Sequence, residues 1–280
     1  MATASTNSGS DPEDILSNSL GFLYDYAPVT YSSAGSVYTY ISPSTSRSSE
    51  APLTVTLATP ETHAKNWSLH ASSIWVASIY IADHLDDLDL DVHPSRTLRI
   101  LELGAGVGLP GILAAKRYSH VRVTSTDYPD EGLIRELEAN VRRNEVSERC
   151  GVIPYAWGSD VTPLRVDNDI ADVAGFDIVI AADTLWNPET HRPFITTLHE
   201  TLARTADARI HLVAGMHTGP YVIQSFLNTV QKDGLEVVEA SEREVKGDAR
   251  RDWDVGRAEW NDERERRRWV IWVVLRWKTT

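Results

Sequence analysis

The 280-residue sequence contains a single cysteine, Cys150, so the chain can form no internal disulfide and no cysteine-rich zinc site. Its nine histidines include no His-Glu-x-x-His motif, and we expect no metal site. No hydrophobic run approaches the ~18 residues that cross a membrane, and the first residues lack the apolar core of a secretory signal. These absences predict a soluble protein of the cytoplasm, or also of the nucleus, in a reducing compartment.

Basic residues are also scarce. The 27 Lys and Arg stand against 40 Asp and Glu, which gives a formal net charge of −13. Phosphate contacts need Lys and Arg, so the composition disfavours nucleic-acid binding. The negative charge fits a basic partner or serves solubility alone, and the sequence leaves both readings open. The hydrophobic share of 42% is typical of a globular protein.

The chain divides into three parts by composition. Residues 1–14 are rich in Ser, Thr and acidic residues and predict a disordered tail. Within an N-terminal β extension over residues 15–66, the β-branched and aromatic segments at 36–41 and 53–59 predict a small hairpin. Residues 67–280 form one large domain in this division.

From residue 67 onward, strand patterns and helix patterns alternate, beginning with a helix over 72–85. Such alternation predicts an α/β fold in which helices cover both faces of a mostly parallel sheet. The seven expected strands are 97–103, 121–127, 151–157, 176–183, 208–216, 235–241 and 269–277.

The last two expected strands have no helix between them and predict an antiparallel pair at the sheet edge. Only the charge-dense segment 242–268 joins them. We expect this segment to be a solvated loop, with a substrate-docking loop as the alternative. Its arginines form a local basic cluster that is weak evidence for nucleic-acid binding; they are Arg264, Arg266, Arg267 and Arg268.

The motif LELGAGVGLPG at 101–111 runs from an apolar strand through glycines into a helix that Pro110 opens. Such a loop binds either a dinucleotide or S-adenosylmethionine beyond the carboxyl end of its strand. A dinucleotide pattern is met only from Gly106, whereas the strand register starts the turn at Gly104. From Gly104 the dinucleotide pattern fails at Leu109, so the loop favours S-adenosylmethionine.

Four further residues stand where such a cofactor is bound. Glu102 is placed to meet the cationic amino-acid end of the cofactor. Asp127 ends the second strand, where it either accepts the ribose hydroxyls or caps the next helix. Trp157 ends the third strand and either packs on the adenine or belongs to the core. Asp183 ends the fourth strand and either faces the site or caps a turn.

Four segments together resemble the family 16 methyltransferases of the seven-β-strand type, and within them the fungal nicotinamide N-methyltransferase-like group, which includes an elongation factor methyltransferase. These segments are LELGAGVGLPG, TDYPDEGLIRELEANV, PYAWGSD and FDIVIAADTLWNPETH. The resemblance covers about residues 65–240 and implies a Rossmann-like methyltransferase domain over 67–280 with S-adenosylmethionine as cofactor. The cofactor contacts that it implies are Gly104, Ala105, Gly106, Asp127, Trp157 and Ala182.

One segment departs from the family pattern. The family carries LWGHxLWNA before the first core strand, and this chain has NWSLHASSIWVAS instead. Trp75 fits the second tryptophan. Trp67 fits the first, which is a cofactor contact in the family, only with an insertion of three residues. The change bears on the choice of substrate.

The resemblance implies methyl transfer to a nitrogen atom, and we predict a protein lysine or N-terminal amine as the acceptor. Asp183 is the candidate to receive a proton or to orient the amine, and Trp186 and Asn187 could line the acceptor pocket. We expect a monomer with a protein partner that is basic or translation-associated. A nicotinamide-like acceptor and a non-catalytic binding module remain alternatives, whereas the lack of a Tyr-x-x-x-Lys pair disfavours an oxidoreductase.

Overall fold

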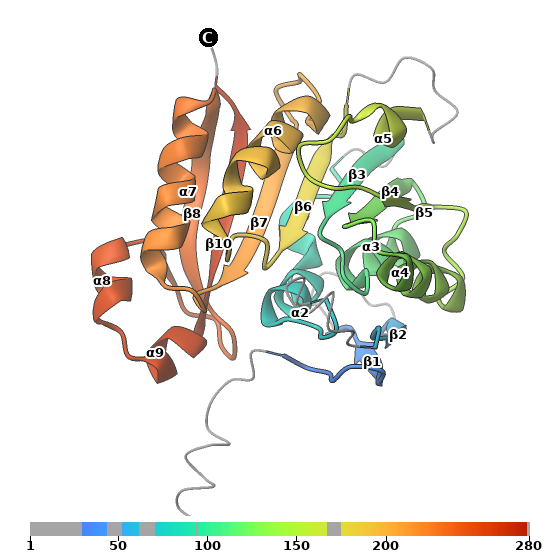
Figure 1. Ribbon diagram of the computed structural model, residues 1–280, viewed down its shortest axis with the longest axis horizontal. Coiled ribbons are helices and arrows are strands. Elements are labelled where there is room, and N and C mark those ends of the chain that lie inside the picture. Colours follow the sequence, from blue (N-terminus) through green and yellow to red (C-terminus); the bar gives the residue numbers. More distant parts are fainter. Residues whose placement is uncertain (1–29, 44–51, 62–70, 93–94, 167–174, 279–280) are drawn as a thin grey trace, which may run out of the picture.

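The computed structural model describes residues 30–43, 52–61, 71–92, 95–166 and 175–278. The predicted tail over 1–14 and the predicted cofactor residue Trp67 lie outside these residues. The centre of the molecule is an eight-stranded sheet (Figure 1). Its strands, in spatial order, are β5 (Cys150–Pro154), β4 (Val121–Asp127), β3 (Leu98–Leu103), β6 (Ile178–Ala182), β7 (Arg209–Gly215), β10 (Trp269–Trp277), β8 (Leu235–Glu244) and β9 (Arg250–Asp252).

The predicted mostly parallel sheet is confirmed. Strands β5, β4, β3, β6 and β7 are parallel, and β10 lies antiparallel between β7 and β8. All seven expected strands are present, and the three-residue β9 adds an eighth at the edge. Because β8 pairs antiparallel with β10, it runs in the same direction as β7. The end of β8 therefore lies at the carboxyl edge of the parallel strands.

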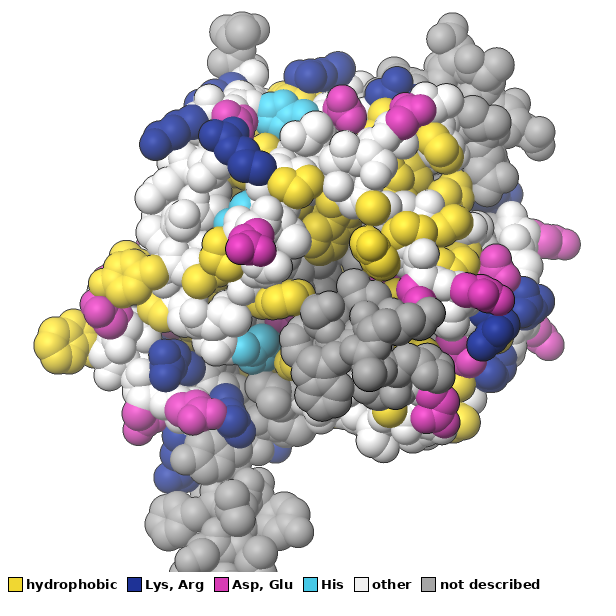
Figure 2. Space-filling view, in the orientation of Figure 1, with side chains coloured by type: hydrophobic (Ala, Val, Ile, Leu, Met, Phe, Trp, Pro, Cys, Tyr) yellow, Lys and Arg dark blue, Asp and Glu magenta, His cyan; other side chains and the backbone are white. Residues whose placement is uncertain are grey.

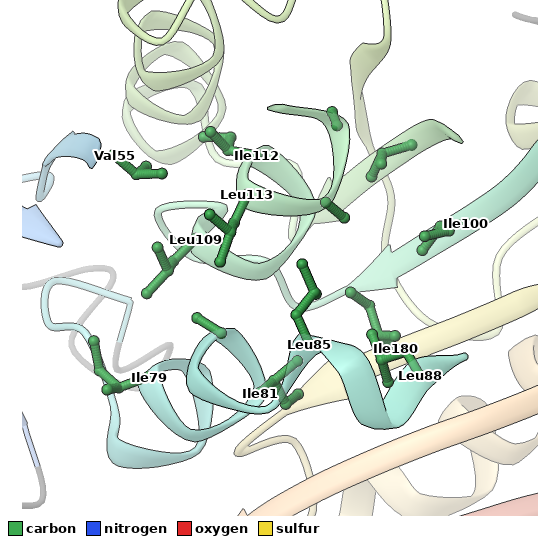
Figure 3. Packing of buried hydrophobic residues seen from close by; sticks show 14 of the residues in the cluster. Val55, Ile79, Ile81, Leu85, Leu88, Ile100, Leu109, Ile112, Leu113 and Ile180 are labelled. Carbon is green, nitrogen blue, oxygen red and sulfur yellow. The ribbon is translucent and has the colours of Figure 1, made fainter. Parts of the chain in front are cut away.

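Helices cover both faces of the sheet, and each face has its own hydrophobic core. The helices are α2 (Val76–Asp83), α3 (Leu109–Arg117), α4 (Glu131–Arg143), α5 (Thr162–Val166), α6 (His191–Thr201), α7 (Pro220–Lys232), α8 (Val255–Trp260) and α9 (Glu263–Arg267). Figure 3 shows one core, where α2, the short 3-10 helix η2 (Leu85–Leu88) and α3 pack on β3 and β6. The other core joins α6 and α7 to the opposite face. Within the described ranges, no helix is long and apolar enough to cross a membrane.

The predicted N-terminal hairpin is present as β1 (Val37–Ile41) and β2 (Thr54–Ala58), which pair antiparallel. Val55 and Leu57 of β2 are completely buried against the main domain. An asparagine of α4 and the asparagine that follows its last residue bind the outer edge of β2: Asn140 Oδ1 accepts from the backbone of Ala58 at 2.8 Å, and Asn144 binds Thr56 in the same way. The hairpin has no core of its own and is stabilised by these contacts.

The segment 242–268 is folded, so the prediction of a solvated loop is wrong. It contains the end of β8, all of β9 and the helices α8 and α9. The reason is a buried ion cluster: the fully buried Glu242 pairs with Arg251 at 2.6 Å and with Arg257 at 2.8 Å. A count of charged residues cannot show that opposite charges neutralise one another inside the fold.

The arginines of the predicted basic cluster lie in α9 and at its end. Arg268 pairs with Glu244 at 2.7 Å and with Glu265 at 3.0 Å. Arg267 pairs with Glu263. These acidic partners offset part of the positive charge, so α9 presents a mixed surface.

Candidate active site

A cavity of about 650 Å³ opens at the carboxyl edge of the parallel strands. This is where open α/β sheets bind their ligands, and the volume suits a ligand of several hundred daltons. The structure brings every predicted site residue that it describes to this one cavity. These residues are Glu102, Gly104, Ala105, Gly106, Asp127, Trp157, Ala182 and Asp183.

The glycine loop forms one wall of the cavity between β3 and α3. Gly104, Gly106 and Gly108 all have left-handed backbone angles, with φ of 65°, 56° and 82°. Such angles favour glycine. A side chain at Gly106 would meet no atom within 4 Å, so the loop leaves open space beside its backbone. A ligand can therefore approach the peptide groups of the loop closely.

Glu102 lies behind the glycine loop and is almost completely buried. Its carboxylate accepts hydrogen bonds from Ser125 Oγ at 2.6 Å and from the Gly111 backbone at 3.3 Å. Burial raises the pKa of Glu102 to about 7, with a smaller upward contribution from the charge of Asp127. Near neutral pH this carboxyl is therefore partly protonated, and a positive group beside it would stabilise its charged form.

Asp127 ends β4 and accepts hydrogen bonds from the backbone N–H groups of Gly106, at 2.6 Å, and Tyr128, at 2.7 Å. Burial raises its pKa to about 6, although these two bonds act in the opposite direction. The alternative role as cap of the following helix is wrong, because Asp130 caps α4 by accepting from Gly132 and Leu133. Asp127 instead links the end of β4 to the glycine loop.

Trp157 and Ala182 form the apolar side of the cavity. Trp157 is half-buried and packs on Phe194, with the ring centroids 4.7 Å apart. A Cβ atom at Gly104 would lie 3.2 Å from the Trp157 ring, which is a tight contact. Glycine at this position therefore lets the ring pack against the loop. The small Ala182 leaves room opposite the loop. These surfaces suit a flat, uncharged ring.

Asp183 connects three elements at the far side of the cavity. It has a left-handed backbone with φ of 53°, which is uncommon outside glycine. Its carboxylate accepts from the backbone of Gly215 at 2.6 Å and of Ala77 at 3.1 Å. The ring nitrogen Nε2 of His217 lies 3.3 Å from Asp183 Oδ1, and the His217 ring lies against Trp75 with centroids 5.3 Å apart.

Residues 60–233 match the model of a family described as lysine methyltransferase. The chain belongs to this family. The predicted resemblance to family 16 is thereby confirmed, and the cofactor of this methyltransferase is S-adenosylmethionine.

Fungal enzymes are among the curated relatives of this lysine methyltransferase family member. The protein N-terminal and lysine N-methyltransferase efm7 of Schizosaccharomyces pombe is 30% identical over 61% of this chain and 66% of its own length. The enzyme of the same name from Gibberella zeae is 30% identical over 62% of this chain and 69% of its own. The matched segments thus span about two thirds of these relatives.

Solved structures with a similar chain path are more distant. The glycopeptide N-methyltransferase MtfA complexed with sinefungin has a TM-score of 0.48 and 11% identity, over 72% of this chain and 87% of its own. The Methanococcus jannaschii fibrillarin pre-rRNA processing protein has a TM-score of 0.45 and 15% identity, over 67% and 69%.

The cavity fits S-adenosylmethionine in charge and in shape. The cofactor carries a cationic sulfonium and an amino group, and the cavity contains two buried carboxyls with raised pKa values, Glu102 and Asp127. Neither of them forms an ion pair with a Lys or Arg among the residues that the structure describes. The open space beside Gly106 and the apolar surface at Trp157 complete a site for a charged chain joined to a flat ring.

Several residues that line the cavity were not predicted from the sequence, and Tyr128, Tyr155 and His217 are among them. Tyr128 directly follows Asp127, and Tyr155 directly follows β5. His217 stands two residues after β7. The rule that ligands lie beyond the carboxyl ends of parallel strands, applied to the fifth parallel strand as well, would have indicated His217.

Proposed function

We propose that the protein transfers a methyl group from S-adenosylmethionine to an amine of another protein, either a lysine side chain or an N-terminal amine. The observation that carries this proposal is that one cavity has two different walls. The glycine loop, Glu102 and Asp127 form one wall, and Asp183, His217 and Trp75 form the other. The names of the fungal relatives support the same reaction.

The cofactor, when bound, supplies a methyl group on a positively charged sulfur. In this proposal Glu102 and the glycine loop hold its amino-acid end, and Asp127 accepts the ribose hydroxyls. Trp157 and Ala182 enclose the adenine. Binding in this way fixes the position of the reacting carbon in the cavity.

An acceptor amine is protonated near neutral pH and must lose one proton before its nitrogen can bond to carbon. Both Asp183 oxygens are already bound to backbone N–H groups, so we assign Asp183 a positioning role. His217 lines the cavity and is held by Asp183, which places an imidazole where it can accept the proton of the amine.

We propose a basic protein as the acceptor, because the net charge of −13 attracts basic partners over a distance. Translation-associated proteins of the cytoplasm are the first group to examine, and we propose that the enzyme works in the same compartment. A nicotinamide-like small molecule remains the alternative acceptor that the same experiment must separate.

The test is methyl transfer from labelled S-adenosylmethionine by the purified full-length protein. The acceptors are a short peptide with a free N-terminus and one lysine, the same peptide acetylated at the N-terminus, nicotinamide and a fungal lysate. We expect label in peptide and in protein, and an initial rate that falls about a hundredfold in His217→Gln while cofactor binding is unchanged. Label in nicotinamide alone would overturn the proposal.

A further inference from the structure

The most exposed large hydrophobic residue of the described chain is Trp260, at the end of α8, with 89% of its surface exposed. Tyr221 in the first turn of α7 is 55% exposed. Its hydroxyl donates to the carboxylate of Glu259, which precedes Trp260. We call Tyr221, Glu259 and Trp260 the aromatic ledge. Figure 2 shows hydrophobic side chains projecting from the α8 end of the molecule, with an acidic side chain between them.

The aromatic ledge lies at the same edge of the sheet as the cavity. The connection from β8 to β10 starts and ends at the carboxyl edge of the parallel strands, because Glu244 and Gly215 both pair with the first residues of β10. Thr218 lines the cavity, and Tyr221 follows it by three residues. A protein that presents an amine to the cavity therefore passes close to the aromatic ledge.

The exposed position of Trp260 is held by a rigid support. Ala258 in the middle of α8 is completely buried, and Asp254 caps the helix by accepting from Gly256 at 2.9 Å. Arg257 anchors the same helix to the buried Glu242. A tryptophan that is fixed on the surface in this way offers a large aromatic side chain of the kind that is enriched at the centres of protein interfaces.

The chemistry of the aromatic ledge favours a cation. Aromatic faces attract Lys and Arg side chains, and a carboxylate beside them strengthens the attraction. Tyr221 binds Oε2 of Glu259, and no Lys or Arg within the described ranges forms an ion pair with this carboxylate. Its second oxygen remains available to a positive group from outside.

We propose that the aromatic ledge binds a Lys or Arg side chain of the acceptor protein, at a distance from the amine that is methylated. This inference rests on the proposed function and adds a second contact for the same partner. Two contacts on one chain lower the KM of an acceptor that can reach both. The contact selects basic proteins without entering the cavity.

The experiment uses synthetic peptides with a free N-terminal Gly-Lys, a Gly-Ser linker of graded length and a final Arg or Gln. Steady-state methylation of the wild-type protein should give a KM about fivefold lower for the Arg peptide at one range of linker lengths. Trp260→Ala and Glu259→Gln should remove this difference. Val92→Ala truncates another exposed hydrophobic residue, which lies near the opposite edge of the sheet, and should leave it intact.

A second measurement does not depend on turnover. Protein labelled with ¹⁵N in its tryptophans gives one indole signal for each, and Trp260→Phe assigns that of Trp260. We expect this signal to shift with the Arg peptide and to remain in place with the Gln peptide. An unmoved signal, or equal KM values for both peptides with the wild-type protein, would overturn the inference. A shifted signal without methyl transfer to any peptide would instead contradict the proposed function, while it would still support binding at the aromatic ledge.

Discussion

Glu102 and Glu242 are both withdrawn from solvent, but their surroundings differ. Glu242 at the end of β8 is fully buried and pairs with Arg251 and Arg257. Glu102 at the end of β3 is buried to almost the same degree, and its partners among the described residues are a serine hydroxyl and a backbone N–H. One carboxylate has its positive partners inside the fold. The other has a pKa raised to about 7, because no such partner offsets its burial.

The difference separates structure from function in this protein. Burying an ion is costly unless its charge is balanced, and Arg251 and Arg257 balance the charge of Glu242 inside the C-terminal part of the fold. Glu102 and Asp127 keep an unbalanced pair of carboxyls beside a cavity, which stabilises a cationic ligand rather than the empty fold. The same residue type therefore serves two purposes, according to whether an arginine lies beside it.

The largest test of this comparison is to neutralise each glutamate in turn. Glu242→Gln leaves two arginines without their buried partner and should lower the free energy of unfolding by about 3–5 kcal/mol. Glu102→Gln stands in for the protonated carboxyl that burial favours, so near neutral pH it should not lower the free energy of unfolding and should raise it by up to roughly 3 kcal/mol. Urea unfolding of the cofactor-free protein measures both. Equal losses would show that the two glutamates play the same part.

The second test uses pH. Burial raises the pKa of Glu102 from 4.5 to about 7, so the folded state retains this proton when the unfolded state has lost it. Its contribution to stability is fully present below about pH 4.5 and is lost as the pH rises through about 7, which amounts to roughly 3 kcal/mol at most. In Glu102→Gln this loss is absent. The buried His211, with a pKa lowered to about 4, acts in the opposite direction, so the difference between wild type and variant is the quantity to measure. A flat difference from about pH 5 to pH 8 would contradict the pKa.

The sequence alone predicts the parallel sheet, the hairpin and the part of the cavity that is formed by the glycine loop and the strand ends. These features follow from local patterns: an apolar strand, a glycine turn, or a residue at the carboxyl end of a strand. Glu102 and Asp127 are predictable because the chain passes directly from a strand to the ligand edge at both places. The predicted family membership follows from the same segments.

The rest depends on contacts between distant segments. The pairing of Glu242 with Arg257, the insertion of β10 between β7 and β8, and the role of Asp183 as a link between Gly215 and Ala77 join residues far apart in the sequence. The charge pattern of 242–268 is equally compatible with a solvated loop and with a folded ion cluster. Only the packed structure distinguishes the two.

The third test concerns Asp127. Replacement by Asn removes the negative charge and one of the two acceptors that now bind Gly106 and Tyr128. A charge-assisted hydrogen bond contributes about 1.5–3 kcal/mol, so affinity for S-adenosylmethionine should fall roughly ten- to a hundredfold. Asp130→Asn is the matched control, because asparagine caps a helix as well as aspartate does. Calorimetric titration that gives the same dissociation constant for Asp127→Asn and wild type would exclude a ribose contact.

The smallest expected effect is the pH dependence of cofactor affinity. A cationic ligand beside Glu102 lowers the pKa of this carboxyl from about 7, so binding releases a proton wherever the free protein still holds one. Affinity should therefore rise by about tenfold from about pH 5.5 to about pH 7.5 and level off above the pKa of the free protein. Glu242 is already paired with its own arginines, and Arg257→Lys should leave this profile unchanged. Titration calorimetry in two buffers of different ionisation enthalpy counts the released protons directly. An affinity that stays constant over this range, with no proton released, would show that cofactor binding does not change the pKa of Glu102. The two glutamates would then differ only in their protein partners.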